Sequence, residues 1–317
     1  MEFRKAFVRY MAPVISRMGM TGLMNRAHVK IVLPFYHIVS DDKCDHVRHL
    51  YRFKNIRQFE NDLDILLHHF EPVSAASIKS IVGGKKFTKP PMHLSFDDGL
   101  REMREIVAPI LYARGIPASF YINTDYVGNR DLMFRYKASL LTEKFPEKRN
   151  VFMAAVCEED LRSIPEYTSI NFKDFLNEHR PYMNWEEVKE LASMGFEVGS
   201  HGKSHAYFYR LTEEEQYADA IEPYEIMKHH GVFSEPRIFA FPFTDSGVSK
   251  RTIRELLDAG GVEICLGGAG FKGEDEPRHL QRVPMEGYDA DAGEVVKAEL
   301  LYTILRGGMQ KHKVKRA

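Results

Sequence analysis

The chain has 317 residues, of which 44% are hydrophobic and 28% charged, with a formal net charge of −1. This composition is typical of a globular protein, and the absence of an uninterrupted apolar run of about 18 residues argues against a transmembrane enzyme. The cysteines Cys44, Cys157 and Cys265 are odd in number and form no C-x-x-C pair. They therefore indicate neither a disulfide framework nor a thiolate zinc site, and they favour a reducing compartment.

Both ends of the chain are basic. The segment 1–30 has six lysines and arginines against Glu2 alone, and the segment 306–316 has no acidic residue. We expect a basic N-terminal helix or extension over 1–29, one catalytic domain over 30–305 and a basic tail over 306–317. Such ends could touch an anionic membrane surface, although a solvated helix and a disordered tail are commoner.

The start of the chain also bears on location and partners. Arg9 and Arg17 interrupt what would be the apolar core of a leader, and no small-residue cleavage site follows. We therefore expect no signal peptide and a cytoplasmic protein, with peripheral membrane contact through the basic N-terminal segment as a variant. Nucleic-acid-binding motifs are absent, so we expect no nucleic-acid partner. Nothing in the sequence indicates an oligomeric state.

From residue 30 onward, short β-like runs alternate with segments of helical spacing. The runs are Ile31–Tyr36, Met92–Phe96, Ala118–Ile122, Phe196–Ser200, Arg237–Phe241, Glu263–Leu266 and Arg282–Met285. Strands that alternate with helices predict an α/β fold with a mainly parallel sheet, either closed or open.

Several helices between these runs have readable ends. Asn184 begins a capping box and Gly195 ends the helix that follows it, while Ser249 is placed to cap another. Pro109 lies inside a helical pattern, where it predicts a kink or an early stop. The segment 129–183 breaks the rhythm with mixed charge and prolines. We interpret it as an insertion of two or three short helices on one rim of the fold.

Polar clusters follow two of the predicted strands. Ser95-Phe-Asp-Asp-Gly99 ends one run, and His201-Gly-Lys-Ser-His205 directly follows another. Each motif alone is usually incidental, since D-D-G is common in turns. In a parallel α/β fold, however, the carboxyl ends of all strands meet on one face. The two motifs are therefore expected to come together there, with His37 and Pro242-Phe243 after two further strands.

This combination of side chains suits a hydrolytic metal site. Two imidazoles and one carboxylate bound to a metal such as Zn²⁺ leave a position open for water. Two adjacent aspartates fit two roles, because a metal ligand uses its lone pair on the cation whereas a general base keeps its own for a proton. Both carboxylates reach one site only if the chain leaves the strand there, which Gly99 permits.

The motifs resemble those of the polysaccharide deacetylase family, the NodB-homology domains of carbohydrate esterase family 4. Ser95–Gly99 matches its first motif, T/S-F-D-D-G, and His201–His205 closely matches its second, H-S/T-x-x-H. The flanks APILYARGIPASFYIN and NWEEVKELASMGFEVGSHGKSH are also similar. The resemblance implies a distorted (β/α)7–8 barrel, here a single domain with a helical insertion at about 129–183.

The resemblance also implies the chemistry, which is removal of an N-acetyl group from an amino sugar. Asp98, His201 and His205 would hold a divalent metal, with Zn²⁺ expected first and Co²⁺ or Ni²⁺ as alternatives. Asp97 would be the general base. The oxyanion would be stabilised by the metal and by a backbone N–H near Phe243, in the Pro242-Phe243 segment.

The sequence departs from the family at two motifs. Ala240-Phe-Pro-Phe243 stands where the family has R-x-P-Y, so the arginine that orients the base is missing, and Arg282 is our candidate replacement. The late L-x-H motif, which supplies the general acid, is also absent. A branch that acts on β-1,6-linked N-acetylglucosamine carries a Y-H element and an F-A-Y-P-Y motif, and Tyr36-His37 and Phe239–Phe243 resemble these. His37 is therefore our candidate for the acid or for a substrate contact.

Alternative functions stay open at this point. The substrate would be an N-acetylhexosamine in a polysaccharide, an oligosaccharide, a nucleotide-linked or a lipid-linked form. An amidohydrolase of the same barrel acting on a small non-sugar amide is one alternative, and a binding protein for acetylated sugar that lacks turnover is another. Aromatic residues would favour sugar, and the candidates for such stacking are Tyr207, Phe208, Tyr209 and Tyr288. The insertion offers Arg135, Tyr136 and Lys137, to which the sequence assigns no role.

Overall fold

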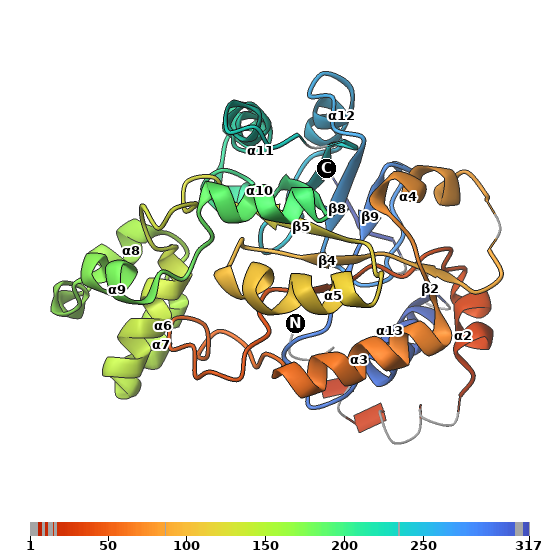
Figure 1. The fold of residues 1–317 in the computed structure, drawn as a ribbon, viewed down its shortest axis with the longest axis horizontal. Coiled ribbons are helices and arrows are strands. Elements are labelled where there is room, and N and C mark those ends of the chain that lie inside the picture. Colours follow the sequence, from red (N-terminus) through yellow and green to blue (C-terminus); the bar gives the residue numbers. More distant parts are fainter. Residues whose placement is uncertain are drawn as a thin grey trace.

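The computed structural model describes residues 18–85, 87–233, 235–307 and 313–316, together with Ala6, Phe7, Tyr10, Met11 and Ile15 (Figure 1). Twelve residues of the basic extension predicted for 1–29 lie outside these residues. Within that stretch the structure contains helix α2, Met20–Ala27. No helix among the described residues has the length and apolar character needed to cross a membrane.

The centre of the protein is an eight-stranded sheet in which every neighbouring pair is parallel. Its order is β10-β1-β4-β5-β6-β7-β8-β9. The strands are β1 (Pro34–Tyr36), β4 (Leu94–Phe96), β5 (Ala118–Ile122), β6 (Glu197–Ser200), β7 (Ile238–Ala240), β8 (Ile264–Gly267), β9 (His279–Gln281) and β10 (Val283–Pro284). Each predicted β-like run overlaps one of them, while β9 was not predicted.

The sheet closes on itself through its last two strands. Only Arg282 separates β9 from β10, yet β9 pairs with β8 and β10 pairs with β1. One extended run of chain thus joins both edges of the sheet, and the predicted distorted (β/α)7–8 barrel is confirmed. A second small sheet pairs β2 (Glu71–Pro72) with β3 (Pro91–Met92).

Helices surround the barrel (Figure 1). They are α3 (Ile56–His69), α4 (Ala75–Val82), α5 (Ala108–Ala113), α10 (Trp185–Ser193), α11 (Glu213–His229), α12 (Lys250–Asp258) and α13 (Ala292–Gly307). The predicted caps are present, because Asn184 accepts hydrogen bonds from Glu186 and Glu187 and Ser249 accepts one from Thr252. The irregularity expected near Pro109 is a π-helical turn, Met103–Val107, directly before α5. Helix α13 was not predicted.

Four short helices lie between β5 and α10, to one side of the barrel (Figure 1). They are α6 (Phe134–Lys144), α7 (Arg149–Ala154), α8 (Glu158–Arg162) and α9 (Phe172–His179), with 3₁₀ turns at Pro146–Lys148 and Pro165–Ser169. This is more than the two or three helices predicted for 129–183. Helices of five or six residues are too short to show a periodic pattern.

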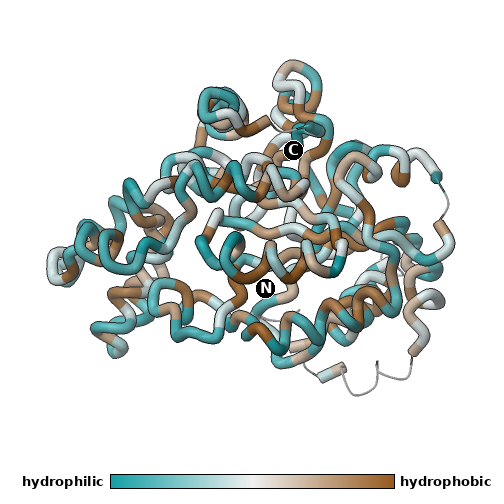
Figure 2. Tube along the Cα trace, in the orientation of Figure 1, coloured by the Kyte–Doolittle hydropathy of each residue, from teal (hydrophilic) through white to brown (hydrophobic). Residues whose placement is uncertain are grey.

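The hydrophobic core fixes where the strands end. The central strands β4 and β5 are buried along their whole length, and Figure 2 shows apolar residues along them and on the facing helices. Phe96 and Phe120, from these two strands, stack with their ring centroids 5.1 Å apart. The strands are therefore held rigidly, and the polar residues at their carboxyl ends are held in fixed positions as a result.

Candidate metal centre and active site

The two aspartates leave β4 in different directions. Asp98 has φ +73° and Gly99 has φ +69°, so two consecutive residues adopt the left-handed conformation. For a residue other than glycine this conformation is uncommon, and it ends the alternation of the strand at this point. Both carboxylates are buried, with Asp97 1% and Asp98 4% exposed. The break predicted from Gly99 is present, and Asp98 shares it.

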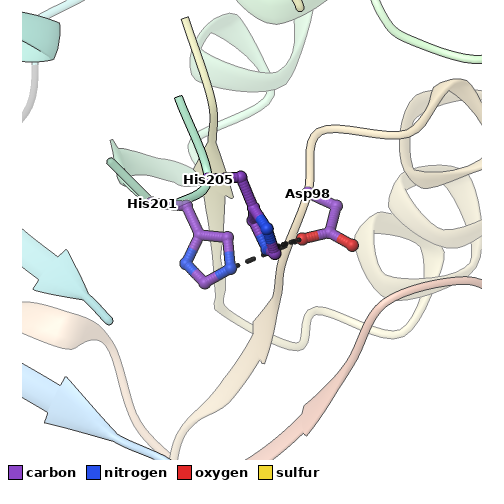
Figure 3. Close-up of side chains that lie close together, drawn as sticks. All are labelled: Asp98, His201 and His205. Carbon is purple, nitrogen blue, oxygen red and sulfur yellow. Dashed lines mark ion pairs between the residues drawn. The ribbon is translucent and has the colours of Figure 1, made fainter. Parts of the chain in front are cut away.

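Asp98 lies against both histidines of the second motif (Figure 3). Its Oδ1 is 3.1 Å from Nε2 of His205 and 3.4 Å from Nε2 of His201. One ligand atom from each of the three residues lies within 4.8 Å of the others, and all three residues are buried. The structure thus brings the three predicted metal ligands together.

The orientation of His201 leaves its Nε2 free to bind a metal. Nδ1 of His201 lies 2.9 Å from the carbonyl oxygen of Ala240, which can only accept a hydrogen bond. Nδ1 therefore carries the proton and Nε2 keeps its lone pair, the arrangement usual for a ligating histidine.

The loop between the two histidines is also pinned. The amide of Asn123 donates to the carbonyl of His201, and Asp219 accepts hydrogen bonds from the backbone and hydroxyl of Ser204. A Cβ at Gly202, where φ is +78°, would lie 2.4 Å from Oδ2 of Asp219. The motif thus needs a glycine here, both for its backbone conformation and for this close approach.

The residues fit a divalent metal. Oδ1 of Asp98 is buried, and no described residue gives it a hydrogen bond. An ionised carboxylate that lacks a hydrogen bond and faces two imidazole nitrogens is the donor set of mixed nitrogen and oxygen sites.

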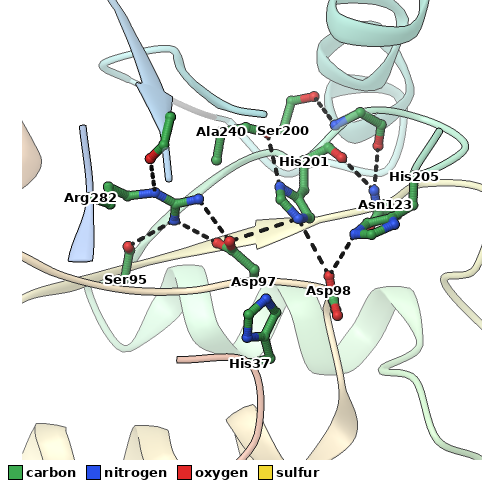
Figure 4. Close-up of polar contacts among 12 residues, drawn as sticks. His37, Ser95, Asp97, Asp98, Asn123, Ser200, His201, His205, Ala240 and Arg282 are labelled. Atoms are coloured by element: carbon green, nitrogen blue, oxygen red, sulfur yellow. Dashed lines mark hydrogen bonds and ion pairs between the residues drawn. The ribbon is translucent and has the colours of Figure 1, made fainter. Parts of the chain in front are cut away.

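Asp97 faces the opposite side, toward Arg282 (Figure 4). Nη1 and Nη2 of Arg282 donate to Oδ1 and Oδ2 of Asp97, both at 2.7 Å, and Nη1 also donates to the hydroxyl of Ser95 at 3.1 Å. Arg282 is 1% exposed, and its guanidinium lies over the Phe35 ring at 4.3 Å. Burial raises the pKa of Asp97, but Arg282, together with His201 and His37, more than offsets burial and holds the pKa below its usual value. The carboxylate is therefore ionised and fixed by a two-pronged ion pair.

His37 pairs with Glu286. Nδ1 of His37 is 2.5 Å from Oε2 of Glu286, while Oε1 accepts hydrogen bonds from the backbone N–H groups of His37 and Ile38. Burial alone lowers the pKa of His37, but the charge and hydrogen bond of Glu286, with the charges of Asp98 and Asp97, raise it to about 9. The imidazole is therefore protonated at neutral pH. His37 lines the same pocket as Asp97 and Asp98.

That pocket has a volume of about 280 Å³ and an aromatic wall. Phe243, φ +53°, stacks on Tyr207 with centroids 3.9 Å apart and meets the His205 ring at 4.3 Å. The segment Pro242-Phe243 thus lies beside the candidate ligands. Of the other aromatic residues considered above, Tyr288 also lines the pocket, whereas Phe208 is buried in the core and Tyr209 is 49% exposed and outside the lining.

Two further residues complete the site and were not identified from the sequence. Tyr136, on insertion helix α6, donates from its hydroxyl to Oδ2 of Asp98 at 2.6 Å. Glu286 holds His37, as described above. Tyr136 belongs to the polar aromatic cluster noted in the insertion, but nothing in the sequence connects it to Asp98. Glu286 follows the strand that closes the barrel, and only that closure brings it to His37.

Comparisons with known proteins agree with this geometry. Residues 84–264, more than half of the chain, match the family described as polysaccharide deacetylase. None of the curated proteins compared with the sequence matches it. IcaB from Ammonifex degensii is similar in structure, with 18% identity, coverage of 86% of this chain and 97% of that chain, and a TM-score of 0.57.

Two other solved structures share the fold. The Streptococcus pyogenes deacetylase PplD in complex with acetate has 13% identity, covers 87% of this chain and 98% of its own, and gives a TM-score of 0.57. A de-N-acetylase from Aggregatibacter actinomycetemcomitans has 17% identity, covers 83% and 95%, and gives 0.53. His37, Arg282 and Glu286 all lie outside the residues that match the family.

Proposed function

The chain belongs to the polysaccharide deacetylase family and is a hydrolase of carbon–nitrogen bonds, and we propose that it removes the N-acetyl group of an N-acetylated amino sugar. One observation carries the proposal: one ligand of the candidate metal site and an ion-paired aspartate follow the same strand, β4, and a protonated histidine lines the same pocket. These are the groups needed to activate water, accept its proton and protonate the leaving amine.

Asp98, His201 and His205 would hold the metal. Two imidazole nitrogens and one carboxylate oxygen suit Zn²⁺ first and Co²⁺ or Ni²⁺ as alternatives. A bound divalent cation supplies Lewis acidity, which lowers the pKa of water and polarises the acetyl carbonyl. The hydroxyl of Tyr136 fixes the second oxygen of Asp98, so that Oδ1 stays directed at the histidines.

Asp97 is placed to act as the general base. It is ionised, and Arg282 holds both of its oxygens, so the carboxylate cannot rotate away from the site. In this proposal Asp97 takes a proton from the attacking water, whose oxygen forms a bond to the acetyl carbon. Arg282 thus replaces the arginine that is missing from the third family motif.

His37 is placed to act as the general acid. With a pKa of about 9 it carries a proton at neutral pH. Its proton passes to the amide nitrogen as the carbon–nitrogen bond breaks, which releases a free amine and acetate. Glu286 stabilises the imidazolium before transfer, and the same pairing fixes the ring.

The pocket supports an acetylated sugar as the substrate. A volume of about 280 Å³ is at the small end for ligand sites and suits one sugar ring with its acetyl group. Tyr207 and Phe243 offer aromatic faces, and a backbone N–H near Phe243 would stabilise the oxyanion. Among the similar structures, one is a de-N-acetylase and one is a deacetylase with acetate bound, which supports acetate as the product released.

The test measures metal content and acetate release together. Purified protein receives N-acetylated hexosamines, short oligomers, and lipid-linked and nucleotide-linked forms, with Asp97→Asn as the control. We expect acetate from one substrate class, lost in Asp97→Asn while the metal stays bound. Bound metal without acetate from any of these would favour an amidohydrolase of non-sugar substrates or a binding protein without turnover. Wild-type protein that binds no metal would contradict the proposal.

A further inference from the structure

The segment 313–316 docks against the barrel and buries an arginine. Lys313 pairs with Gly273 as a parallel bridge, and the N–H of Val314 donates to the Gly273 carbonyl at 3.0 Å. The side chain of Arg316 is then only 4% exposed. Part of the tail expected to be disordered is therefore folded onto the protein.

The guanidinium of Arg316 contacts two buried carboxylates and the main chain. Nη2 donates to Oδ2 of Asp245 and, at 2.6 Å, to Oε1 of Glu274, while Nε donates to Oε2 of Glu274 at 2.9 Å. Nη1 donates to the carbonyl oxygens of Asp245 at 2.8 Å and Val248 at 3.5 Å. Arg316 thus holds both the side chain and the backbone of Asp245.

The surrounding side chains form a close-packed network. Gln281 donates to Asp245 at 2.5 Å and to Glu274 at 2.7 Å. A Cβ at Gly267 would lie 2.4 Å from Oδ2 of Asp245, so glycine leaves the space that the network fills. His279, with Asp245 and Glu274, would be close enough to hold a metal ion. Because Nη2 of Arg316 already bridges the two carboxylates, we assign the cluster to charge pairing.

This network adjoins the active-site pocket through a very short stretch of chain. Asp245 is two residues from Phe243, and the N–H of Thr244 donates to the Pro242 carbonyl at 2.5 Å, so the intervening chain is tightly turned. Phe243 itself is held in the left-handed conformation against Tyr207 and His205. A shift of Asp245 would therefore be passed on to the pocket wall.

We propose that Arg316 is a positioning residue that fixes the loop Phe241–Val248 and, through it, Phe243 in the pocket. Its effect on turnover rests on the proposed function, whereas its effect on the loop does not. Without the guanidinium, the buried carboxylates of Asp245 and Glu274 lie close together and lose the arginine that binds both of them. The carbonyl oxygen of Asp245 loses its hydrogen bond from Arg316 as well. Such a pair separates or takes up water, which moves the loop.

The experiment compares Arg316→Ala, Arg316→Lys and wild-type protein, with Lys313→Ala as the matched control. Lys313 lies in the same segment, but its ion pair with Asp275 is exposed, at 55% and 56%. Two quantities are measured on the full chain: hydrogen exchange of the Phe243–Val248 amides, and kcat and KM for acetate release. Metal content is recorded for each variant.

We expect Arg316→Ala to exchange faster over Phe243–Val248 and to lose roughly ten- to hundredfold in kcat with KM changed little, because the loop is misplaced rather than absent. The exchange rate and kcat of Arg316→Lys should lie between those of Arg316→Ala and wild type, since one ammonium group cannot make all the hydrogen bonds of the planar guanidinium. If Arg316→Ala does not fold, Arg316→Lys carries the test. Exchange and kcat equal to those of Lys313→Ala would overturn the proposal. Faster exchange in a protein whose wild type releases no acetate would refute the proposed function and leave the role in the loop standing.

Discussion

The two sides of the active site balance their charges differently. On the side of Asp97, each ionised group meets an opposite charge within the protein: Arg282 faces Asp97, and Glu286 faces His37. On the side of Asp98, the described residues provide no cationic partner beyond two histidines, and the carboxylate oxygen that faces them has no hydrogen bond. One side is electrostatically complete, and in our proposal a bound cation would complete the other. Asp97 and Asp98, adjacent in the sequence, thus have different surroundings, as the two roles that we propose for them require.

The largest expected effect comes from replacing each of the two aspartates, Asp97 and Asp98, by asparagine in separate variants. Asp98→Asn removes the anionic ligand, so we expect loss of bound metal and of acetate release. Asp97→Asn keeps the metal and loses about 10² to 10⁴ in kcat, the usual contribution of a general base. Metal analysis of the two purified variants, beside turnover, measures both. Equal metal content in the two variants would show that the sides are not separate.

Arg282→Met tests whether the Asp97 side is balanced by its own ion pair. Both partners are almost fully buried, so removing one charge leaves the other uncompensated. We expect a loss of about 3–5 kcal/mol in the free energy of unfolding, measured with urea. The double variant Asp97→Asn/Arg282→Met should be less destabilised than Arg282→Met alone. If Arg282→Met alone were as stable as wild type, Asp97 would not depend on Arg282 for its charge balance.

Most of the fold and most of the site residues could be predicted, because both are encoded locally. The strand runs and the Asn184 and Ser249 caps are patterns of neighbouring residues, and the two motifs each end a strand. Glu286 could not be found this way. It meets His37 only because β10 closes the barrel beside β1, a contact across 249 residues.

Arg282 was a hypothesis from its position near a late strand, and the structure supplies its contact with Asp97. Tyr136 lies on insertion helix α6, whose 11 residues are buried nearly all round and so give no clear amphipathic pattern. The insertion therefore supplies a functional contact that only tertiary structure reveals.

Glu286→Gln sharpens the comparison through pH. Glu286 contributes most to raising the pKa of His37 to about 9, so replacing its carboxylate should return that pKa toward 6.5. Because the protonated imidazole is the proposed acid, the alkaline limb of the kcat/KM profile should shift to lower pH by about two units. The raised pKa also means that the pairing stabilises the fold fully below about pH 6.5 and ceases to do so as the pH rises through about 9. An unshifted alkaline limb would exclude His37 as the acid.

Tyr136→Phe should have the smallest effect on activity and the most specific one. Removing the hydroxyl frees Oδ2 of Asp98 to rotate, and we expect metal affinity to fall about tenfold, as for other groups that orient a ligand. Turnover at saturating metal should remain near wild type, because Tyr136 contacts no group assigned to proton transfer.

Tyr182→Phe is the matched control for this variant. Tyr182 stacks on Tyr136, but its hydroxyl accepts from the N–H of Met133 instead of contacting Asp98. Its loss should lower stability without changing the affinity for metal. If the two variants lose metal equally, the contribution of α6 is general packing; if only Tyr136→Phe does, the insertion is part of the metal site. A loss of metal affinity in Tyr136→Phe alone would explain why a helix outside the barrel contacts Asp98, the proposed metal ligand.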